Sequence, residues 1–419
     1  MIREGMHMEL RLSSLFVATL VWLGSAFAAN AQQADALRWS DIEAAINKHP
    51  AMRLAQDEVA VAKAQIGVSR QYPNPEISAS LGQGRAFDGS ETALIWGIEL
   101  EIPIDAPGSY LNEKEAAKAG YKAAEYETAA RRLEIYRQLK GLFYRIAIGQ
   151  EQQKVQNESL LQLKRLVEVA GLRVDQGEAR PMEVARLEIE LEKLQSDVAA
   201  EKENLNAIRS NLNLWLGDKL PMDFKVEVTW RDLPEIPQLK SIIHQVLKLH
   251  PSLLAAGQRV TASKALTRAE RNRLLPDIKL GGFYDREMDA HNYGGMLSIE
   301  LPLWNWNRGS ISKARAEESA ARNEQELAQK ELIASVQGAH AAANLAIKRA
   351  RRYAERILPM ARKIGEELEA MYRVGEMDII DVLDSRRSLI ETETDMLAAF
   401  KDGWLAYLDL VALMGGDNE

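Results

Sequence analysis

The strongest constraint on the fold is that the 419-residue chain contains one sequence pattern twice. His49-Pro50 recurs as His250-Pro251, 201 residues later, and Leu216-Gly217 recurs as Met414-Gly415, 198 residues later. A repeat of this size has to be recognised before any fold is assigned. We therefore predict two copies of one unit, residues 40–217 and 239–415, joined by a linker over 218–238. The other matched segments are 75–77 with 276–278, 102–104 with 301–303, and 174–178 with 372–376.

The N-terminus has the pattern of an export signal. Arg11 precedes an apolar run over residues 15–23, and small residues follow up to Ala31. This pattern predicts a signal peptide over residues 1–31. The alternative, a membrane-anchoring helix, needs about 20 apolar residues, which this run does not reach. No later stretch is long and apolar enough for a membrane-spanning helix, so insertion of the mature chain into a membrane requires a β-barrel.

The spacing of proline, glycine and apolar residues predicts mostly helix. Each copy has one very long tract, which is followed by a sharp turn at Gly177 or Gly375 and by a return helix. Alanine recurs at heptad-like spacing, which is typical of close antiparallel coiled coils. Pro359 is expected to kink the second long tract. The predicted helices are 41–48, 51–71, 109–176 and 182–216 in the first copy, and 241–249, 252–274, 308–374 and 378–414 in the second.

Two short runs in each copy alternate as β-strands do. Leu94, Ile98 and Ile102, for example, face away from Glu99 and Glu101. Such runs fit either ordinary hairpins on a soluble core or tilted strands that cross a bilayer, and the export signal favours the bilayer. Four strands cannot close a barrel, and an open sheet edge is not stable in lipid. We therefore expect several copies of the chain to pool their strands, which makes the protein an obligate oligomer.

Composition and motifs exclude several classes of function. The chain has no cysteine and a net charge of −8, which argues against disulfides, thiol chemistry and a nucleic-acid partner. The histidines lack metal-ligand spacing, and His49 and His250 precede proline, where a turn role is expected. No nucleotide-binding loop or nucleophile motif occurs. The sequence predicts no catalytic activity, no cofactor and no metal site.

Taken together, the residues resemble the TolC-like outer-membrane efflux family, and most closely its CzcC-type heavy-metal branch. The resemblance implies a trimer: long helices form an α-barrel tunnel through the periplasm, and four strands per chain form a shared transmembrane β-barrel in the outer membrane. It also implies docking to a periplasmic adaptor protein and an inner-membrane RND pump. The segments that carry the resemblance are His-Pro in each copy, 73–76, 301–309, and Tyr372-Arg373-Val374-Gly375-Glu376 leading into Asp381-Val382-Leu383-Asp384.

The same resemblance implies a periplasmic gate. Asp381 and Asp384 match paired aspartates around the closed mouth of the tunnel, where six carboxylates from three chains favour cations. Tyr372 matches a tyrosine whose hydroxyl ties neighbouring helix pairs together, and Glu183 matches a carboxylate used in such ties. Arg186 stands in the first copy where Asp384 stands in the second, so an Arg186–carboxylate contact that keeps the mouth shut is a further hypothesis.

Two alternatives remain open at this stage. Asp378 is suited to cap the second return helix, and Asp381 lies in its first turn, where the helix dipole favours a carboxylate without any gating role. For the whole protein, the leading hypothesis is an outer-membrane exit duct of an RND-type efflux system for metal cations. The alternative is a soluble periplasmic helical-hairpin adaptor or scaffold.

Overall fold

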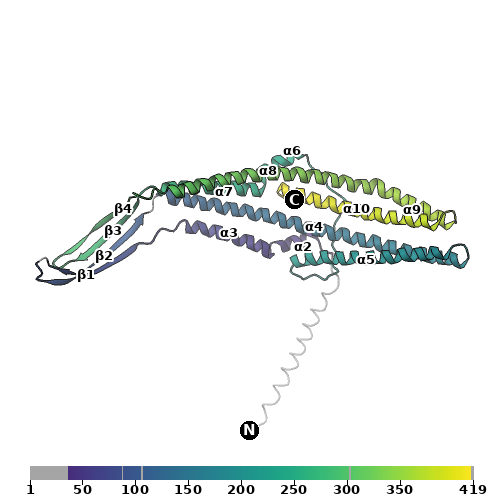
Figure 1. Ribbon diagram of the computed structural model, residues 1–419, viewed down its shortest axis with the longest axis horizontal. Coiled ribbons are helices and arrows are strands. Elements are labelled where there is room, and N and C mark those ends of the chain that lie inside the picture. The colour runs from purple at the N-terminus through teal and green to yellow at the C-terminus, as the bar shows by residue number, and fades with distance from the viewer. Residues whose placement is uncertain (1–35, 87, 105–106, 302, 417–419) are drawn as a thin grey trace, which may run out of the picture. The chain divides into compact units, whose positions relative to one another are not determined.

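A computed structural model describes residues 36–86, 88–104, 107–301 and 303–416, and the predicted signal peptide lies outside these ranges. Long helices dominate the chain (Figure 1), and the two repeats present their main elements in the same order. The helix ends fall within about three residues of the predicted ones. The first repeat contains α2 (Trp39–Ile46), α3 (Pro50–Val68), β1 (Glu76–Arg85), β2 (Thr92–Ile104), α4 (Pro107–Asp175) and α5 (Pro181–Trp215); the second contains α6 (Leu239–Leu249), α7 (Pro251–Asn272), β3 (Asp277–Arg286), β4 (His291–Glu300), α8 (Arg308–Arg352), η1 (Tyr353–Ile357), α9 (Leu358–Arg373) and α10 (Ile379–Met414).

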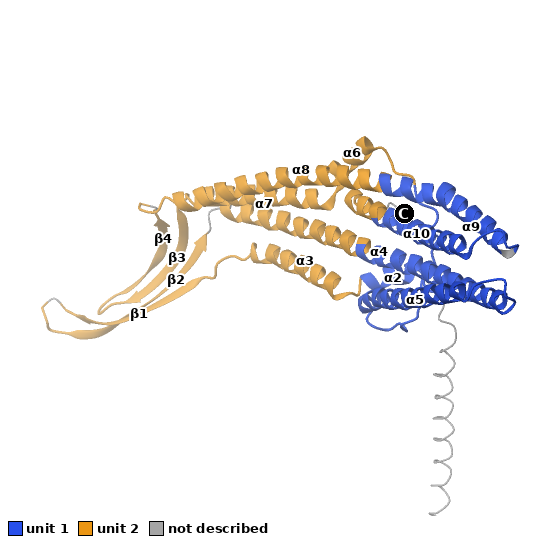
Figure 2. Cartoon of the chain, turned by 45° about the vertical axis from the view of Figure 1, so that its right-hand side comes forward, with its two compact units in different colours: residues 1–46, 138–234, 345–405 blue, residues 47–137, 235–344, 406–419 orange. Residues whose placement is uncertain are grey.

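The chain divides into two compact units, which are coloured separately in Figure 2. Unit 1 consists of residues up to Ile46, 138–234 and 345–405, and it contains α2, α5 and α9. Unit 2 consists of residues 47–137, 235–344 and the segment from Ala406, and it contains α3, α6, α7 and the strands. The repeats and the compact units therefore differ, because each unit takes segments from both repeats.

The four strands of unit 2 form one antiparallel sheet in the order β1-β2-β3-β4. The hairpin of the first repeat joins the hairpin of the second through the β2–β3 pair, in which Ile98 lies opposite Tyr284. The outer edges of β1 and β4 pair with no further strand in the described part of the chain. The sheet therefore keeps two open edges.

The register of the sheet separates apolar from polar side chains. Ile98 is paired with Ala79 and Tyr284, and Ile102 with Leu280, so that these side chains share one face. Its large apolar residues are exposed in the single chain rather than covered by a helix. The opposite face carries mostly glycine, serine and charged residues, together with Ile95, Phe283 and Met296. On this face the ammonium of Lys279 lies 3.2 Å from a carboxylate oxygen of Glu101. The exposed apolar residues of this face are Ile77, Leu81, Leu94, Ile98, Leu100, Ile102, Ile104, Ile278, Leu280, Tyr284, Tyr293, Leu297 and Ile299, and the half-buried Trp96 lies among them.

The second long helix is interrupted just before Pro359. Here α8 ends at Arg352, the π-helical turn η1 follows, and α9 begins with Pro359 in its first turn. Proline has no N–H to donate and its ring collides with the carbonyl four residues earlier, so the wider turn accommodates it. The expected disturbance at Pro359 is thus present as a π-turn. In the first repeat, α4 runs without interruption for 69 residues.

The two His-Pro segments begin helices in the same way. The Nδ1 atom of His49 accepts a hydrogen bond from the backbone N–H of Ala51 (3.1 Å), and Nδ1 of His250 accepts one from that of Ser252 (3.3 Å). Proline occupies the first turn of each helix, where its missing N–H costs nothing. The predicted turn role is therefore a helix N-cap made by an imidazole.

Part of the predicted linker is hydrogen-bonded to the helices of unit 1. Gln150 of α4 bonds both backbone groups of Val226, at 2.9 and 3.1 Å. The indole Nε1 of Trp404 on α10 donates to the carbonyl oxygen of Trp230 at 2.6 Å. Because these bonds use backbone atoms of the linker, they hold its path with little dependence on its side chains.

Candidate functional site

The residues singled out by sequence lie in unit 1, around two similar hairpin turns. One turn joins α4 to α5 and the other joins α9 to α10. Gly177 has φ of 76° and Gly375 has φ of 81°, a left-handed conformation that glycine adopts without strain. The N–H of Glu178 bonds the carbonyl of Arg173 at 2.8 Å, and the N–H of Glu376 bonds that of Met371 at 3.0 Å. Both turns thus end their helices with the same glycine-dependent motif.

A hydrophobic cluster joins the two hairpins near these turns. Its buried members come from all four helices, and residues of α4 and α5 contact residues of α9 and α10. The repeating three- and four-residue spacing on each helix places these side chains on one stripe. The cluster fixes the two hairpins against each other within one chain. Its buried residues are Leu163, Leu166, Ala170, Leu187, Leu194, Tyr372, Ile379 and Val382.

Tyr372 is the one aromatic member of this cluster, and only 1% of its surface is exposed. The guanidinium of Arg173 lies 4.9 Å from the centre of its ring and donates to its backbone carbonyl oxygen at 3.3 Å. The hydroxyl is buried without a hydrogen-bond partner among the described residues of one chain. Burial raises the pKa of this phenol, and the nearby Arg173 charge acts in the opposite direction. A buried hydroxyl in this state requires an explanation.

Glu183 and Arg186 lie on the first turns of α5. An oxygen of Glu183 accepts a hydrogen bond from the backbone N–H of Arg180 at 3.1 Å, so this carboxylate caps its own helix. Arg186 is exposed, and no ion pair joins it to a carboxylate within the described part of a single chain. The contacts expected for these two residues, to Tyr372 and to a gate carboxylate, are therefore not made inside one chain.

Asp381 and Asp384 are exposed on the first turns of α10. The helix cap is provided by Asp378, whose carboxylate accepts from the backbone N–H of Ile380 at 3.4 Å. Asp384 lies 3.8 Å from the guanidinium of Arg387, one turn further along. The cap expected at Asp378 is confirmed, and neither Asp381 nor Asp384 is needed for it.

Sequence reasoning missed two arginines that connect the hairpins. Arg387 on α10 forms a two-pronged pair with Glu190 on α5, and Arg386 bonds both Gln162 on α4 and Glu369 on α9. The hydrogen bond from Arg387 is the main cause of a lowered pKa of Glu190. The only sequence signal is opposite charge on two distant helices, which does not single out these partners.

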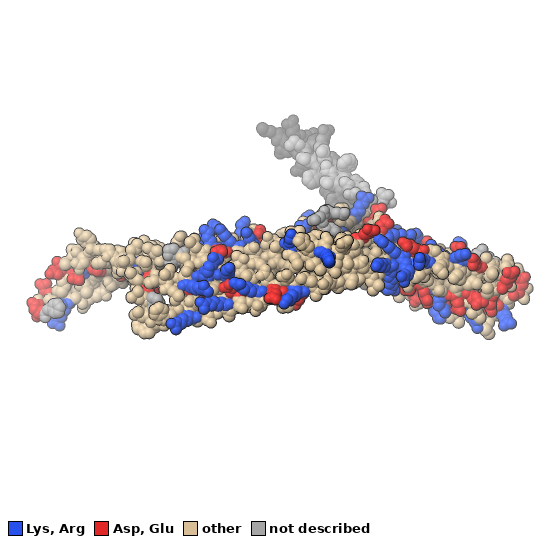
Figure 3. Space-filling model, turned by 90° about the horizontal axis from the view of Figure 1, so that it is seen from above, with Lys and Arg blue, Asp and Glu red and all other residues tan. Residues whose placement is uncertain are grey.

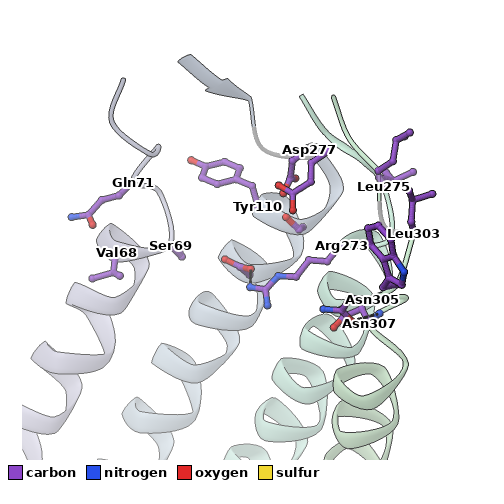
Figure 4. A pocket seen from close by; sticks show the side chains of 15 residues that line it. Val68, Ser69, Gln71, Tyr110, Arg273, Leu275, Asp277, Leu303, Asn305 and Asn307 are labelled. Atoms are coloured by element: carbon purple, nitrogen blue, oxygen red, sulfur yellow. Dashed lines mark hydrogen bonds and ion pairs between the residues drawn. The ribbon is translucent and has the colours of Figure 1, made fainter. Parts of the chain in front are cut away.

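Unit 2 contains an open pocket of about 730 Å³ where the strands meet the helices. Figure 4 shows Arg273 extending from α7 toward α4, with Tyr110 on one side and Asn305 and Asn307 on the other. The Arg273 guanidinium is paired with Glu113 at 2.7 Å and with Glu270 at 2.8 Å. The two carboxylates therefore neutralise the positive charge of Arg273, which leaves it poorly suited to bind an anionic ligand in the pocket.

Charges of both signs are interspersed over the helical surfaces on the face shown in Figure 3. Many belong to pairs between helices, such as Arg268 with Glu115 at 2.8 Å in unit 2. Among the described residues, no group of three or more His, Asp or Glu side chains is placed to hold a metal ion. Within the same ranges, no helix combines the length and the hydropathy needed to cross a membrane.

Comparison with known proteins gives a family match over most of the chain. The model of a family described as "Outer membrane efflux protein" matches residues 42–218 and 242–416. The cobalt-zinc-cadmium resistance protein CzcC of Cupriavidus metallidurans is 24% identical over 356 residues, which cover 83% of this chain and 82% of CzcC. The probable outer membrane lipoprotein SilC of Salmonella typhimurium is 21% identical over 392 residues, covering 89% of this chain and 84% of SilC.

Solved structures share the fold. The chain superposes on the channel protein CusC with a TM-score of 0.77 at 18% identity, over 90% of this chain and 92% of that one. It superposes on the outer-membrane channel OprN with a TM-score of 0.75 at 18% identity, over 93% and 94% of the two chains. The arrangement of long helical hairpins and a four-stranded sheet is therefore a known one.

Proposed function

This chain belongs to the outer membrane efflux protein family, and from that premise we propose that three copies form an exit channel for metal cations. The channel spans the outer membrane and reaches into the periplasm. It is the outer component of a tripartite system with a periplasmic adaptor and an inner-membrane RND pump, and it has no catalytic activity of its own.

The observation that carries this proposal is the exposed apolar face of the sheet. Residues such as Ile98 and Leu280 are about half exposed in the described part of the chain, and a hydrocarbon environment removes the cost of exposing them to water. The open edges of β1 and β4 need partners in such an environment, because unsatisfied backbone groups are costly in lipid. Strands of further copies satisfy both edges when the sheets join in a closed ring. The resemblance to TolC-like channels supports three copies.

The polar face of the same sheet then lines the passage. It carries Glu99, Glu101 and Asp285 beside the single lysine Lys279, which pairs with Glu101. A lining with this excess of carboxylates attracts cations. The named relatives CzcC, a cobalt-zinc-cadmium resistance protein, and CusC, a cation efflux protein, support the same class of cargo.

For the periplasmic mouth, we propose the gate residues expected from sequence. Asp381 and Asp384 are exposed on α10, with Arg387 beside Asp384, and in the proposed trimer both carboxylates face the shared axis. The buried hydroxyl of Tyr372 and the carboxylate of Glu183 belong to the contacts that hold the closed mouth, and Arg186 supplies a cation for a carboxylate of another copy. These roles rest on the assembled channel, since a single chain does not make the contacts.

The alternative of a soluble adaptor or scaffold has less support. Such a protein would need a core to cover the apolar sheet face, and the helices that the structure describes leave that face exposed. The family match also favours a channel.

The decisive experiment measures where the mature protein resides and how large it is. We expect it in the outer-membrane fraction, resistant to a salt wash, with a detergent-extracted particle of three chains that conducts ions in planar bilayers. Arg186→Glu should increase the leak conductance, whereas Lys202→Glu, on an exposed site of the same helix, should not. A stable single chain in detergent-free buffer would contradict the proposal.

A further inference from the structure

The apolar face of the sheet carries basic residues at its loop end. The β1–β2 and β3–β4 loops lie at the end of the sheet that points away from the helices of unit 2 (Figure 1). On β3, Arg286 lies opposite both Trp96 and His291, so it shares their face. On β1, Arg85 follows Leu81 by four residues and therefore lies on the same face. Two guanidiniums thus border the apolar surface where the strands end.

The charges of these two arginines are not compensated. Both side chains are exposed, and neither forms an ion pair with a carboxylate in the described part of the chain. On the opposite face, by contrast, Lys279 is paired with Glu101. The nearby loops carry the carboxylates Asp88, Glu91, Glu287 and Asp289. Arg85 and Arg286 therefore keep their charges for an external anion.

Aromatic side chains lie next to Arg286 on the same face. The rings of Trp96 and Tyr284 are 5.5 Å apart between centroids, and a hydrogen bond of 2.7 Å joins the Tyr284 hydroxyl to Nδ1 of His291. Tyr293 lies opposite Tyr284 and is 81% exposed. Tryptophan and tyrosine gather where hydrocarbon gives way to lipid headgroups. These rings therefore mark a membrane–water border, and Arg286 lies just beyond it.

The length of β3 agrees with this placement. From Ile278 to Arg286 the strand rises about 26 Å. The tilt of a transmembrane strand reduces that rise to about 20 Å along the membrane normal, and the apolar band of such barrels is about 25 Å tall. When Ile278 lies near one border of the hydrocarbon, Arg286 therefore lies near the other border, at the level of the lipid headgroups.

The polar groups at this border suit a phosphate. A guanidinium presents paired N–H donors whose geometry matches two phosphate oxygens. When the Tyr284 hydroxyl donates to Nδ1 of His291, the imidazole hydrogen is on Nε2, which gives a third donor beside Arg286. A ligand that satisfies both the donors and the rings carries an anionic group on a hydrocarbon body.

We propose that Arg85, Arg286 and His291, here called the rim site, bind a phosphate group of a lipid in the outer leaflet. The aromatic side chains next to Arg286 pack against the same lipid, and Arg85, two strands away, supplies a second cation nearer the loops. The inference rests on the proposed function, because helices in the periplasm place the loop end of the sheet in the outer leaflet. It adds a ligand to the outside of the barrel.

The test measures the binding of radiolabelled lipid A, a glycolipid with two phosphate groups, to the three-chain particle in a nonionic detergent. Arg85→Gln combined with Arg286→Gln should weaken binding about tenfold or more. Arg85→Lys combined with Arg286→Lys keeps both charges but not the paired donors, so it should weaken binding less. The matched control is Lys122→Gln with Lys202→Gln, two exposed lysines of the helices, which should leave the affinity unchanged.

Two further probes identify what the rim site recognises. Lipid A from which both phosphates have been removed should bind about tenfold more weakly than intact lipid A. Inorganic phosphate in millimolar excess should displace little of the bound lipid, because it gains nothing from the aromatic side chains. Equal binding of the dephosphorylated lipid would overturn phosphate recognition. Full displacement by inorganic phosphate would overturn the lipid as ligand and leave a site for a free anion.

The outcomes separate this inference from the proposed function. A three-chain particle that conducts ions, but whose affinity for lipid A is the same in the double glutamine variant, overturns the rim site and leaves the channel standing. A particle of one chain overturns both. The particle mass of every variant is measured before binding, and a double variant that does not assemble is replaced by Arg286→Gln alone.

Discussion

Arg387 and Glu190 connect the two helical hairpins of unit 1 through a pair of hydrogen bonds, 3.2 Å from Nε to Oε1 and 3.0 Å from Nη2 to Oε2. The pair joins α10 to α5, which lie in different repeats. It is the kind of planar, two-pronged contact for which a guanidinium is suited.

The first prediction concerns the pH dependence of this pair. The hydrogen bond from Arg387 lowers the pKa of Glu190 below its ordinary value of 4.5. Its contribution to stability is therefore present above pH 4.5 and is lost as the pH falls through the lower folded-state pKa. Half of the Arg387 side chain is exposed, so the contribution is at most about 1 kcal/mol. Thermal unfolding of Arg387→Ala should show a smaller loss of stability on acidification than the natural chain. Lys363→Ala, which removes a pair within one helix, should leave the acid dependence unchanged.

The second prediction concerns the hydroxyl of Tyr372. Buried polar groups are nearly always hydrogen-bonded, and this one has no partner inside a single chain. In the proposed channel this buried side chain helps to hold the helix pairs together at the closed mouth, so Tyr372→Phe should raise the leak conductance in planar bilayers while helical content by circular dichroism is unchanged. If the variant is instead more stable and no leakier, the hydroxyl plays no part in closing the mouth.

A third prediction follows from the imidazole cap at His250. Burial lowers the pKa of this histidine below its ordinary value of 6.5, and a protonated Nδ1 cannot accept the Ser252 hydrogen bond. The cap's contribution is fully present above pH 6.5 and is lost as the pH falls through the folded-state pKa. Loss of a helix cap costs about 1 kcal/mol. His250→Asn retains a cap that does not titrate, so its melting temperature should change less between neutral and mildly acidic buffer. His244→Asn, on an exposed site of α6, should behave like the natural chain.

The fourth prediction tests the aspartates at the mouth. Asp381→Asn combined with Asp384→Asn removes six charges from the proposed trimer. The permeability ratio of cations to anions, obtained from the reversal potential in a salt gradient, should fall as a result. Asp402→Asn, on an exposed site further along α10, serves as the control. An unchanged permeability ratio in the double variant would show that these two aspartates are solvent-exposed residues at the start of α10 with no role in ion selectivity.

The fifth prediction addresses the apolar sheet face. Ile98 lies at the middle of β2, and a lysine there should cost about 2–4 kcal/mol in the bilayer interior. Ile98→Lys should therefore reduce the amount of three-chain particle recovered from outer membranes. Ser80→Lys changes a residue of the neighbouring strand that faces the other side of the sheet, and it should assemble normally. Equal recovery of both variants would argue against lipid contact on the Ile98 side.

The sequence predicted the elements of the fold well, because their signals are local. Glycine at 177 and 375, proline after His49 and His250, and alternating apolar residues indicate where helices and strands begin and end. The form of the break at Pro359 was not predictable: a proline disturbs the preceding turn, but whether a kink or a π-turn results depends on the packing around it.

The contacts of the candidate site were harder to predict. Arg387 and Glu190 are 197 residues apart, and their meeting depends on how two hairpins rotate about their axes, which charge alone does not specify. Glu183 illustrates the same difficulty, because its carboxylate accepts a hydrogen bond from a backbone N–H at the start of its own helix. Only the family resemblance singled out Tyr372 and the two aspartates, and their roles at the mouth stay predictions.

The two open edges of the sheet have a consequence for biogenesis. A newly exported chain emerges with an apolar surface and with free backbone groups on β1 and β4, and both invite strand pairing with the wrong neighbour. In the proposed channel, strands of further copies have to pair with both edges before the sheet can enter lipid, so oligomerisation and membrane insertion depend on each other.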